Sequence, residues 1–442
     1  MFFDRIILSQ LQAWTARPKP KPLLLKGARQ VGKTSLLKWY GQKFYPKTAY
    51  FNFDRQPDLK QFFELTKDPL RIIQNLSLVV GFPIEPKTTL IIFDEIQECK
   101  EALNSLKYFE ELEEAFHLVG AGSLLGVTLG NFSSFPVGKV DFLALYPLTF
   151  LEFLDQKDPE MSSYLKSILV IEPIPDYFFN RILESFRLYM ISGGMPEPAK
   201  EWVENADLTR VEELLENINQ AYELDFSKHV PAKDIQKINY IWNSIPSQLA
   251  KENKKFLYQV VKPGARAREF EDALTWLIQA GLVYKISRVT KVGIPLSVYQ
   301  DLAAFKIYFL DVGLLRRKAR LAPTAILNPT ELFSEFKGAL AENYVLQSLM
   351  SQFGEMPSYW TSNGKAEVDF LLSFQNEILP VEVKSGENTR SRSLAVYDEE
   401  NHPKVKLKYS MRNLFYQEGL INIPLFLADR TQDFIALAFK SQ

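Results

Sequence analysis

Residues 27–34 read Gly27-Ala28-Arg29-Gln30-Val31-Gly32-Lys33-Thr34. The spacing G-x-x-x-x-G-K-[ST] is typical of a phosphate-binding loop, or P-loop. An apolar run at residues 22–25 precedes the loop, and a helix-like stretch at residues 35–40 follows it. A chance match in an ordinary loop is the alternative, but this strand–loop–helix order favours nucleotide binding. The stretch therefore predicts an α/β fold whose parallel sheet carries a nucleotide at the end of its first strand.

The residue types in the loop suit a polyphosphate. Its glycines let consecutive backbone N–H groups turn toward phosphates, and the following helix adds partial positive charge at its N-terminus. We expect Lys33 to reach the β- and γ-phosphates of ATP and the Thr34 hydroxyl to bind Mg²⁺. Arg29 is expected to be solvent-exposed or structural. The predicted nucleotide-binding residues are Gly27, Ala28, Arg29, Gln30, Val31, Gly32, Lys33, Thr34, Asp94 and Ser123.

A second strand candidate ends in two acidic residues. Residues 90–93 are continuously apolar, as expected for a strand covered on both faces, and Asp94 and Glu95 follow. In a P-loop ATPase, Asp94 would hold Mg²⁺ through water, and Glu95 would orient and deprotonate the attacking water. The alternative is a buried strand that ends in a solvated acidic turn, but the P-loop upstream favours the catalytic interpretation.

Two further positions bear on hydrolysis. Residues 116–119 form a third strand candidate, and Ser123 after it is a candidate sensor of the γ-phosphate, with a plain turn serine as the alternative. An arginine finger would complete charge neutralisation in the transition state. Lys139, just before the strand candidate at residues 140–145, is a candidate for that role, and no arginine is assigned to it.

Composition bounds the class of protein. The 442 residues suffice for about two to four domains, and a hydrophobic content of 46% supplies ordinary cores. The net charge of −1 excludes a globally basic nucleic-acid binder but not a local basic patch. With a single cysteine and three scattered histidines, the chain has no intramolecular disulfide and no zinc constellation. We expect no signal peptide, no membrane span and no membrane partner, and therefore a soluble cytoplasmic protein.

The pattern along the chain predicts four segments. Residues 1–150 alternate apolar strands with helical stretches, which indicates the P-loop ATPase core with helices on both faces of its sheet. Residues 151–235 are predicted to be a helical lid or linker. Residues 236–320 are predicted to be a winged-helix-like module, and residues 321–442 a mixed α/β nuclease-like domain.

Charge is unevenly distributed over the middle segments. Residues 197–226 hold nine Asp/Glu and two Lys/Arg, which we interpret as a solvated helix face. Residues 254–320 hold 13 Lys/Arg and five Asp/Glu, a local net charge of +8 (13 − 5). Within them, a helix at residues 267–280, a stop at Gly281 and a strand at residues 282–289 form the pattern of a winged helix.

The basic residues of this module are the candidate DNA contacts. A winged helix used only for packing within the protein is the alternative. Residues 316–320 either extend the basic patch or form a charged linker. The candidate DNA-contacting residues are Lys262, Arg266, Arg268, Lys285, Arg288 and Lys291.

A second acidic constellation lies near the C-terminus. Two short strand candidates flank a polar turn at residues 375–376, with Asp369 on the first strand. Glu382 and Lys384 are two residues apart on the second strand and therefore share one face. A helical stretch upstream offers Glu342. The order Glu, Asp, Glu-x-Lys suits metal-assisted phosphodiester hydrolysis.

In that reaction, Asp369 and Glu382 would bind Mg²⁺ or Mn²⁺, which prefer oxygen ligands. Lys384 would position the attacking water or stabilise charge, and Glu342 would orient the site. The alternative is a hairpin whose exposed face carries a salt bridge between Glu382 and Lys384.

With both constellations in place, the chain resembles the prokaryotic AAA-type ATPases that carry an uncharacterised C-terminal domain related to PD-(D/E)xK nucleases. The resemblance covers nearly the whole chain and implies an AAA-type ATPase core, a helical and winged-helix middle and a restriction-endonuclease-like end. Relatives tend to have a Gly-Arg pair where this chain has Gly138-Lys139. Beside the P-loop, the resemblance rests on residues 93–97, 145–153, 193–196, 264–268, 310–314 and 381–386.

We therefore predict a protein that binds and hydrolyses ATP and couples its nucleotide state to DNA engagement, with metal-dependent DNA cleavage as a further activity. One alternative is a slow nucleotide-gated switch whose C-terminal domain only binds DNA or a protein. A second alternative is a nuclease for which ATP is a licensing ligand. By analogy with AAA-type ATPases, whose sites often lie between subunits, a homo-oligomer is also predicted.

Overall fold

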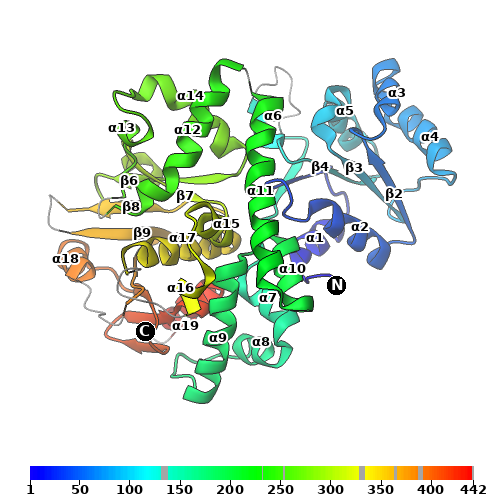
Figure 1. The fold of residues 1–442 in the computed structure, drawn as a ribbon. Coiled ribbons are helices and arrows are strands. Elements are labelled where there is room, and N and C mark those ends of the chain that lie inside the picture. The colour runs from blue at the N-terminus through cyan, green and yellow to red at the C-terminus, as the bar shows by residue number, and fades with distance from the viewer. Residues whose placement is uncertain are drawn as a thin grey trace. The chain divides into compact units, whose positions relative to one another are not determined.

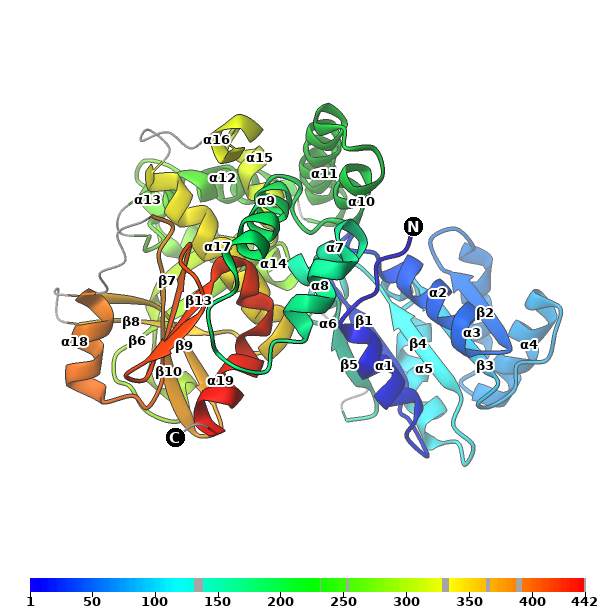
Figure 2. The same ribbon diagram turned by 90° about the horizontal axis from the view of Figure 1, so that it is seen from below.

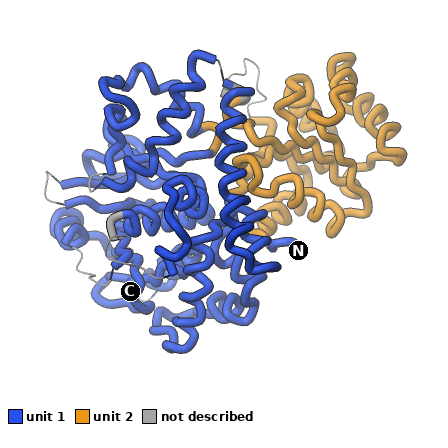
Figure 3. The backbone as a smooth tube through the Cα atoms, viewed as in Figure 1, with its two compact units in different colours: residues 1–3, 147–278, 282–442 blue, residues 4–146, 279–281 orange. Residues whose placement is uncertain are grey.

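The structure, a computed structural model, describes residues 1–130, 138–230, 232–251, 254–327, 334–362, 366–386 and 392–440. The chain divides into two compact units (Figure 3). Unit 2 comprises Asp4–Tyr146 and Gln279–Gly281. Unit 1 comprises Met1–Phe3, Pro147–Ile278 and Leu282–Gln442.

A five-stranded parallel sheet forms the centre of unit 2 (Figure 2). The strand order is β2-β3-β4-β1-β5, so β4 lies between β3 and β1. Because all strands are parallel, their C-terminal ends meet at one edge of the sheet. The strands are β1 Leu23–Lys26, β2 Lys47–Asn52, β3 Thr89–Asp94, β4 His117–Ala121 and β5 Asp141–Ala144.

Helices cover both faces of this sheet, because successive residues of a strand point to opposite sides. Leu118 of β4 packs in an apolar cluster with Phe63 of α3 and Leu106 of α5. Its neighbour His117 faces the other way, with its ring centroid 5.7 Å from that of Trp14 on α1. The predicted parallel sheet with helices on both faces is confirmed. The helices of unit 2 are α1 Ile7–Thr15, α2 Lys33–Phe44, α3 Lys60–Leu65, α4 Pro69–Val80, α5 Lys100–Glu111 and α6 Leu125–Gly130.

An eight-stranded mixed sheet forms the centre of unit 1 (Figure 1). Its order is β12-β13-β11-β10-β9-β8-β6-β7, with parallel and antiparallel pairs. The predicted mixed-sheet C-terminal part is thus present. The strands are β6 Val283–Val289, β7 Gln300–Phe309, β8 Ser358–Thr361, β9 Glu367–Phe374, β10 Glu377–Val383, β11 Lys406–Ser410, β12 Phe415–Gln417 and β13 Leu420–Pro424.

The hairpin of the predicted winged helix belongs to this sheet. Helix α14 (Ala267–Gln279) and the antiparallel pair β6–β7 form where the sequence indicates them. Strand β6 also pairs in parallel with β8, through Arg288 opposite Tyr359 and Val289 opposite Trp360. The predicted boundaries at residues 235 and 320 both lie within unit 1, and the division into segments at residues 151–235, 236–320 and 321–442 stays a prediction.

Helices make up much of the rest of unit 1. No helix among the described residues is long and apolar enough to cross a membrane. The helices not yet given are α7 Phe150–Lys157, α8 Pro159–Lys166, α9 Asp176–Ser192, α10 Pro196–Asn205, α11 Leu208–His229, α12 Ala232–Leu249, α13 Tyr258–Val261, α15 Val312–Lys318, α16 Pro323–Leu327, α17 Ser334–Phe353, α18 Arg392–Asn401 and α19 Thr431–Lys440.

Three of the stretches that carry the family resemblance meet at Gly194. Its carbonyl accepts the Leu148 N–H at 2.6 Å, and its own N–H donates to Asp311 Oδ2 at 2.6 Å. Asp311 also caps α15 by accepting the Leu314 N–H at 3.0 Å. A Cβ on Gly193 would overlap the Asp311 carboxylate, and its φ of +69° favours glycine. These motifs therefore form a structural junction within unit 1.

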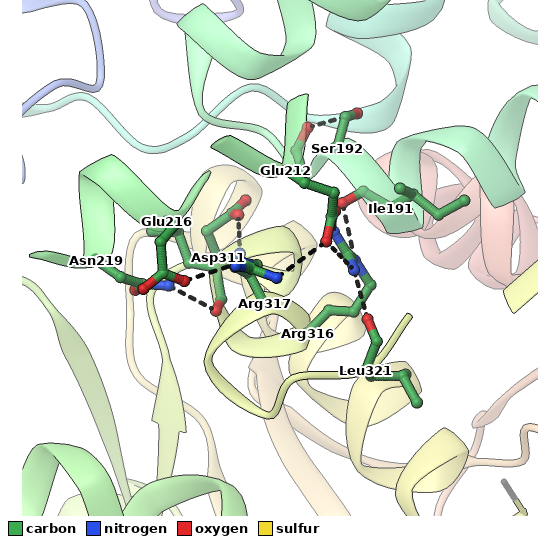
Figure 4. Close-up of polar contacts among 11 residues, drawn as sticks. Ile191, Ser192, Glu212, Glu216, Asn219, Asp311, Arg316, Arg317 and Leu321 are labelled. Atoms are coloured by element: carbon green, nitrogen blue, oxygen red, sulfur yellow. Dashed lines mark hydrogen bonds and ion pairs between the residues drawn. The ribbon is translucent and has the colours of Figure 1, made fainter. Parts of the chain in front are cut away.

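Helices α11 and α15 are joined by ion pairs (Figure 4). The fully buried Arg316 pairs with Glu212 and also donates to the carbonyls of Ile191 and Leu321 at 3.1 and 2.6 Å. Arg317 Nε lies 2.9 Å from Glu216 Oε2, and Lys318 pairs with Glu223. The interpretation of residues 197–226 as a merely solvated face is therefore wrong at these three glutamates, because α15 neutralises them.

Candidate functional site

The P-loop joins β1 to α2 and requires glycine at both ends. Gly27 has φ +153° and Gly32 has φ +96°, which glycine adopts without steric cost. A Cβ on Gly27 would overlap the Leu145 carbonyl oxygen. Of the remaining loop residues, Arg29 and Gln30 are exposed, whereas Ala28 and Val31 are buried. The expectation that Arg29 is solvent-exposed is confirmed.

An arginine near the N-terminus holds the loop in place. Arg5 is buried, and its Nη1 donates to the Val31 carbonyl at 3.1 Å. Its Nη2 donates to the Tyr146 carbonyl at 2.5 Å. No local sequence pattern indicates this role of Arg5, because its two partners lie 26 and 141 residues away.

Lys33 is turned into the loop. It begins α2, is 7% exposed, and donates from Nζ to the carbonyls of Gly27 and Ala28, both at 2.8 Å. Burial lowers the pKa of Lys33 to about 8, although the charges of Glu95 and Asp94 act to raise it. A bound phosphate would therefore compete with two carbonyl oxygens for this ammonium.

One carboxylate oxygen of Asp94, at the end of β3, accepts three hydrogen bonds. Its Oδ2 accepts from Thr34 Oγ1 at 2.9 Å, Tyr50 OH at 2.7 Å and Asn52 Nδ2 at 3.2 Å. Burial and the hydrogen bond to Asp94 raise the pKa of Tyr50 to about 12, so its hydroxyl remains a donor. The sequence analysis missed Tyr50 and Asn52. Asn52 could have been suspected because it is a polar residue at the end of a strand. The β2–β3 register places it opposite Asp94.

Glu95 follows Asp94 in a left-handed backbone conformation, with φ +51°. Residues other than glycine rarely adopt this conformation, and it is common at functional turns. Glu95 Oε2 accepts from Gln97 Nε2 at 2.5 Å and from Ser123 Oγ at 3.5 Å. A Cβ on Gly122 would overlap Gln97, so this glycine permits the close approach. The structure thus brings Lys33, Thr34, Asp94, Glu95 and Ser123 together at the C-terminal edge of the parallel sheet.

The second acidic set lies in unit 1. Asp369 of β9 is tied to β10, because its Oδ2 accepts the Val383 N–H at 2.7 Å. Glu382 Oε1 lies 2.5 Å from Lys384 Nζ. This is the salt bridge expected if the hairpin is structural and not catalytic. Its other oxygen, Oε2, is buried and has no hydrogen-bond partner among the described residues.

Glu342 of α17 is held by residues that the sequence analysis did not assign. Lys254 pairs with Glu342 Oε1, and Tyr308 OH donates to Oε2 at 3.0 Å. Tyr308 lies on β7, as does Lys306, which is fully buried and lies 2.5 Å from Glu367 Oε1. A lysine within the apolar run at residues 304–310 was the available signal, since a buried lysine needs a partner.

The carboxylates of this set influence one another. Burial, together with the charges of Glu342 and Glu382, raises the pKa of Asp369 well above its usual value. Burial also raises the pKa of Glu382, against the opposing effect of Lys384. At Glu342, burial acts to raise the pKa, but Lys254 and Lys306 bring it below the usual value.

As arranged, the second acidic set does not fit a divalent cation. Across the parts of the chain that the structure describes, no group of three or more His, Cys, Asp or Glu side chains could hold a metal ion. Lysines occupy one oxygen of Glu342 and one of Glu382. Metal binding by Asp369 and Glu382 stays a prediction.

Three segments of the chain match known protein families. Residues 19–154 match the family described as AAA domain. This segment is therefore similar to AAA domains, and we name it the AAA domain. Residues 183–325 and 337–427 match two families, each described as a domain of unknown function (DUF8612 and DUF4143). No curated protein sequence matches the chain.

Solved structures similar to the chain also contain ATPases. The Walker-type ATPase PABY2304 of Pyrococcus abyssi is 15% identical, with a TM-score of 0.44 over 72% of this chain and 96% of that one. The RuvB Holliday junction branch migration motor of Thermotoga maritima is 17% identical, with a TM-score of 0.28 over 63% and 86%. These TM-scores are too low to carry an argument about this chain.

Within the AAA domain, Lys139 lies at the wrong edge of the sheet for the nucleotide. It precedes β5, whereas the P-loop follows β1, and these strands are parallel. Its Nζ lies 2.7 Å from Glu110 Oε2. The candidate role of Lys139 as a finger for its own nucleotide site is therefore wrong.

Outside the AAA domain, some of the predicted DNA-contacting residues are exposed, whereas others already contact residues of this chain. Lys262, Arg266 and Arg268 are exposed around α13 and the start of α14, and Lys291 is exposed after β6. Arg288 is paired with Asp301 at 2.5 Å. Lys285 is half-buried, with Nζ 4.4 Å from the centroid of the Phe305 ring. The arginines and lysine at residues 316–318 are occupied by α11 and do not extend the patch.

Proposed function

We propose that the AAA domain binds ATP and hydrolyses it with Mg²⁺. One observation carries this proposal. Thr34, the last residue of the P-loop and the second of α2, and Asp94, at the end of β3, share a hydrogen bond of 2.9 Å although 60 residues separate them. Glu95 follows directly. The oxygens that suit Mg²⁺ and a candidate base thus stand beside a loop that suits phosphates.

Each side chain has a distinct task in this proposal. Thr34 and Asp94 would hold Mg²⁺, which when bound neutralises charge on the β- and γ-phosphate oxygens. Lys33 would exchange its two carbonyl partners for phosphate oxygens. Glu95 would take a proton from the attacking water, and its hydrogen bonds to Gln97 and Ser123 would keep its carboxylate oriented.

The test is ATP turnover by the full-length chain, measured as phosphate release. Lys33→Ala should abolish turnover. Glu95→Gln should retain ATP binding and lower turnover by about 10²- to 10⁴-fold, the usual contribution of a general base. Glu98→Gln, three residues further on, is the matched control. Normal turnover by Lys33→Ala would refute the site assignment, and slow turnover indifferent to DNA would favour the nucleotide-gated switch.

We further propose that the nucleotide state controls the engagement of DNA. The support is the cluster of exposed cations at Lys262, Arg266 and Arg268 in a segment of local net charge +8 (13 − 5). DNA should then stimulate ATP turnover. Turnover and ATP affinity that are both unchanged by DNA would contradict the coupling.

DNA cleavage by the second acidic set is a second candidate function. The observation that favours it is that Glu342 of α17, Asp369 of β9 and the pair Glu382 and Lys384 at the end of β10 influence one another's charge. Cleavage of single-stranded, double-stranded and branched DNA should be assayed with Mn²⁺, with and without ATP. Loss of cleavage in Asp369→Ala but not in Asp398→Ala, an acid on α18, would support it. The absence of cleavage under all conditions would leave a binding domain.

A homo-oligomer is proposed for the ATP-bound chain. A neighbouring copy could supply the positive charge that Lys139 cannot supply from within its own chain. The molar mass in solution, measured with and without ATP, tests this assembly. A monomer mass under both conditions would contradict it.

A further inference from the structure

A pocket in unit 1 is lined by residues of helices α9 and α17. The two helices pack side by side, with the ring centroids of Phe186 on α9 and Tyr344 on α17 only 4.9 Å apart (Figure 2). Next to Phe186 the side chains leave a hollow of about 550 Å³, which includes the solvent at its open mouth. Every residue that lines the pocket belongs to the described parts of the chain.

The walls of the pocket are mostly apolar. Phe186 and Met190 lie one turn apart on α9, and both are buried. Leu340 and Ala341 of α17, which are also buried, line the pocket from the second helix. Because these side chains belong to packed helices, the hollow exists without a ligand, as is usual for sites that bind small molecules. The apolar walls suit a hydrocarbon chain or an aromatic ring.

Positive charge lines the same pocket, but negative charge does not. Arg187 of α9 and Lys337 of α17 are both half-buried, and no Asp or Glu is among the lining residues. Among the described residues, the Arg187 guanidinium has no hydrogen-bond or ion-pair partner. A guanidinium always carries its charge, and a partly buried charge without a partner is costly. An anion bound in the pocket would satisfy this arginine.

The polar groups of the pocket indicate which anion fits. A carboxylate has two oxygens, and the planar fork of one guanidinium can bind both of them together. A phosphate monoester has three strong acceptor oxygens and nearly two negative charges. Besides Arg187 and Lys337, the only lining residue with a side-chain donor is Ser385. Because the other walls are apolar, a carboxylate matches the pocket better than a phosphate does.

We propose that this pocket binds a small carboxylic acid with an apolar body, such as a fatty acid or an aryl carboxylate. The carboxylate contacts the Arg187 guanidinium, and Lys337 adds positive charge. The apolar body lies against Phe186, Met190 and Leu340. The proposal rests on neither ATP binding nor DNA engagement, so its outcome is independent of theirs.

The first test uses the wild-type, full-length chain with octanoate as the probe. Of its seven methionines, only Met190 and Met411 line the pocket. With ¹³C-labelled methionine methyl groups, octanoate should shift the NMR signals of these two residues and leave the other five unchanged. Butyrate should bind at least about tenfold more weakly, because it buries four fewer CH₂ groups. Signals that shift at other methionines, but not at Met190 and Met411, would overturn the proposal.

The second test measures the contribution of Arg187 by isothermal titration calorimetry. Arg187→Met should weaken octanoate binding by about ten- to a hundredfold, the usual effect of losing a hydrogen bond to a charged group. Octanol, which has the same chain without the charge, should bind equally to the wild type and to Arg187→Met. The matched control is Arg181→Met, because Arg181 lies on the same helix, pairs with Asp158 and does not line the pocket.

A third variant fills the pocket. Ile326 of α16 lines the pocket and is half-buried, so Ile326→Trp changes little of the core. It should abolish the binding of both octanoate and octanol, while the circular dichroism spectrum stays that of the wild type. Unchanged octanoate binding in this folded variant would show that the ligand binds elsewhere.

The remaining outcomes decide the chemistry of the ligand. Equal octanoate affinity in the wild type and in Arg187→Met would overturn the contact between the carboxylate and Arg187. Octyl phosphate that binds more tightly than octanoate would overturn the assignment of a carboxylate. Octanoate binding that shifts Met190 and Met411 and requires Arg187 would establish the site.

Discussion

At the residue scale, the ammonium of Lys33 has a lower pKa than an ordinary lysine. Its pKa is lowered to about 8 by burial in the free protein, and contact with phosphate would raise it again. ATP affinity should therefore be full below pH about 8 and fall as pH rises through that value, by about tenfold per pH unit. Isothermal titration calorimetry with Mg²⁺-ATP between pH 7 and 9.5, a range of about 2.5 units, measures this dependence.

Lys33→Arg is the control for this pH dependence. Its guanidinium remains protonated across the range, so its ATP affinity, although weaker, should be flat with pH. A wild-type affinity that does not change above pH 8 would show that burial does not control the charge of Lys33.

The candidate nucleotide site can be assigned from the sequence because its parts are local. Lys33 and Thr34 lie in one octapeptide, and Asp94 and Glu95 end an apolar run that is visible by itself. Tyr50, Asn52 and Arg5 could not be assigned in the same way. They act through strand register or through contacts across the unit, and neither leaves a local pattern.

At the element scale, the buried pair between Arg316 and Glu212 should be a major source of stability between α11 and α15. Arg316→Met leaves Glu212 without its main partner and should lower the free energy of unfolding by about 3–5 kcal/mol. Urea denaturation of unit 1 measures the change. Arg320→Met, at an exposed arginine four residues later, should change stability by less than about 0.5 kcal/mol.

The double variant Arg316→Met/Glu212→Leu extends this experiment. Replacing both partners by apolar residues of similar size should recover much of the loss, because no buried charge is left unpaired. If the double variant is as unstable as the sum of the single variants, the carbonyl contacts of Arg316 with Ile191 and Leu321 carry the stability instead.

The acidic and basic runs on α11 and α15 show that a sequence pattern can predict a helix without predicting the helix that packs against it. The acidic run at residues 197–226 was correctly assigned to helix, but its partner was not predicted. Glu212 and Glu216 lie about one turn apart on α11, and Glu223 lies about two turns further on. Residues 316–318 meet them only because α15 packs alongside. Each run alone has the appearance of a solvated helix or linker.

At the scale of the whole molecule, the exposed cations near α13 should dominate DNA binding. Replacing Lys262, Arg266 and Arg268 together by alanine should weaken binding and reduce the slope of log affinity against log salt by about two to three. Fluorescence anisotropy with labelled duplex DNA at several salt concentrations measures both quantities.

The matched variant replaces Lys285, Arg288 and Lys291 by alanine. It removes the same charge but should affect DNA binding less, because Asp301 already neutralises Arg288 and Lys285 packs on Phe305. Equal losses in the two triple variants would contradict this ranking, and unchanged affinity in both would remove the DNA-contact proposal.

The sequence predicts the two large architectures but not how the second is assembled. The predicted helix at residues 267–280 and strand at residues 282–289 are correct locally. Strand β6 is attached to β8 by two residue pairs whose members lie about 70 positions apart in the sequence. Neither hydrophobic periodicity nor composition indicates such a long-range pairing. As a result, Lys306 and Tyr308 were not recognised as neighbours of the second acidic set.

The pairing of β6 with β8 has a consequence for dissecting the protein. A fragment that begins at residue 337, the start of the matched C-terminal family, keeps β8 and β9 but lacks β6 and β7. One side of β8 would then present unpaired backbone N–H and C=O groups, which readily template aggregation. Poor solubility of such a fragment would reflect a severed sheet, not an inactive domain.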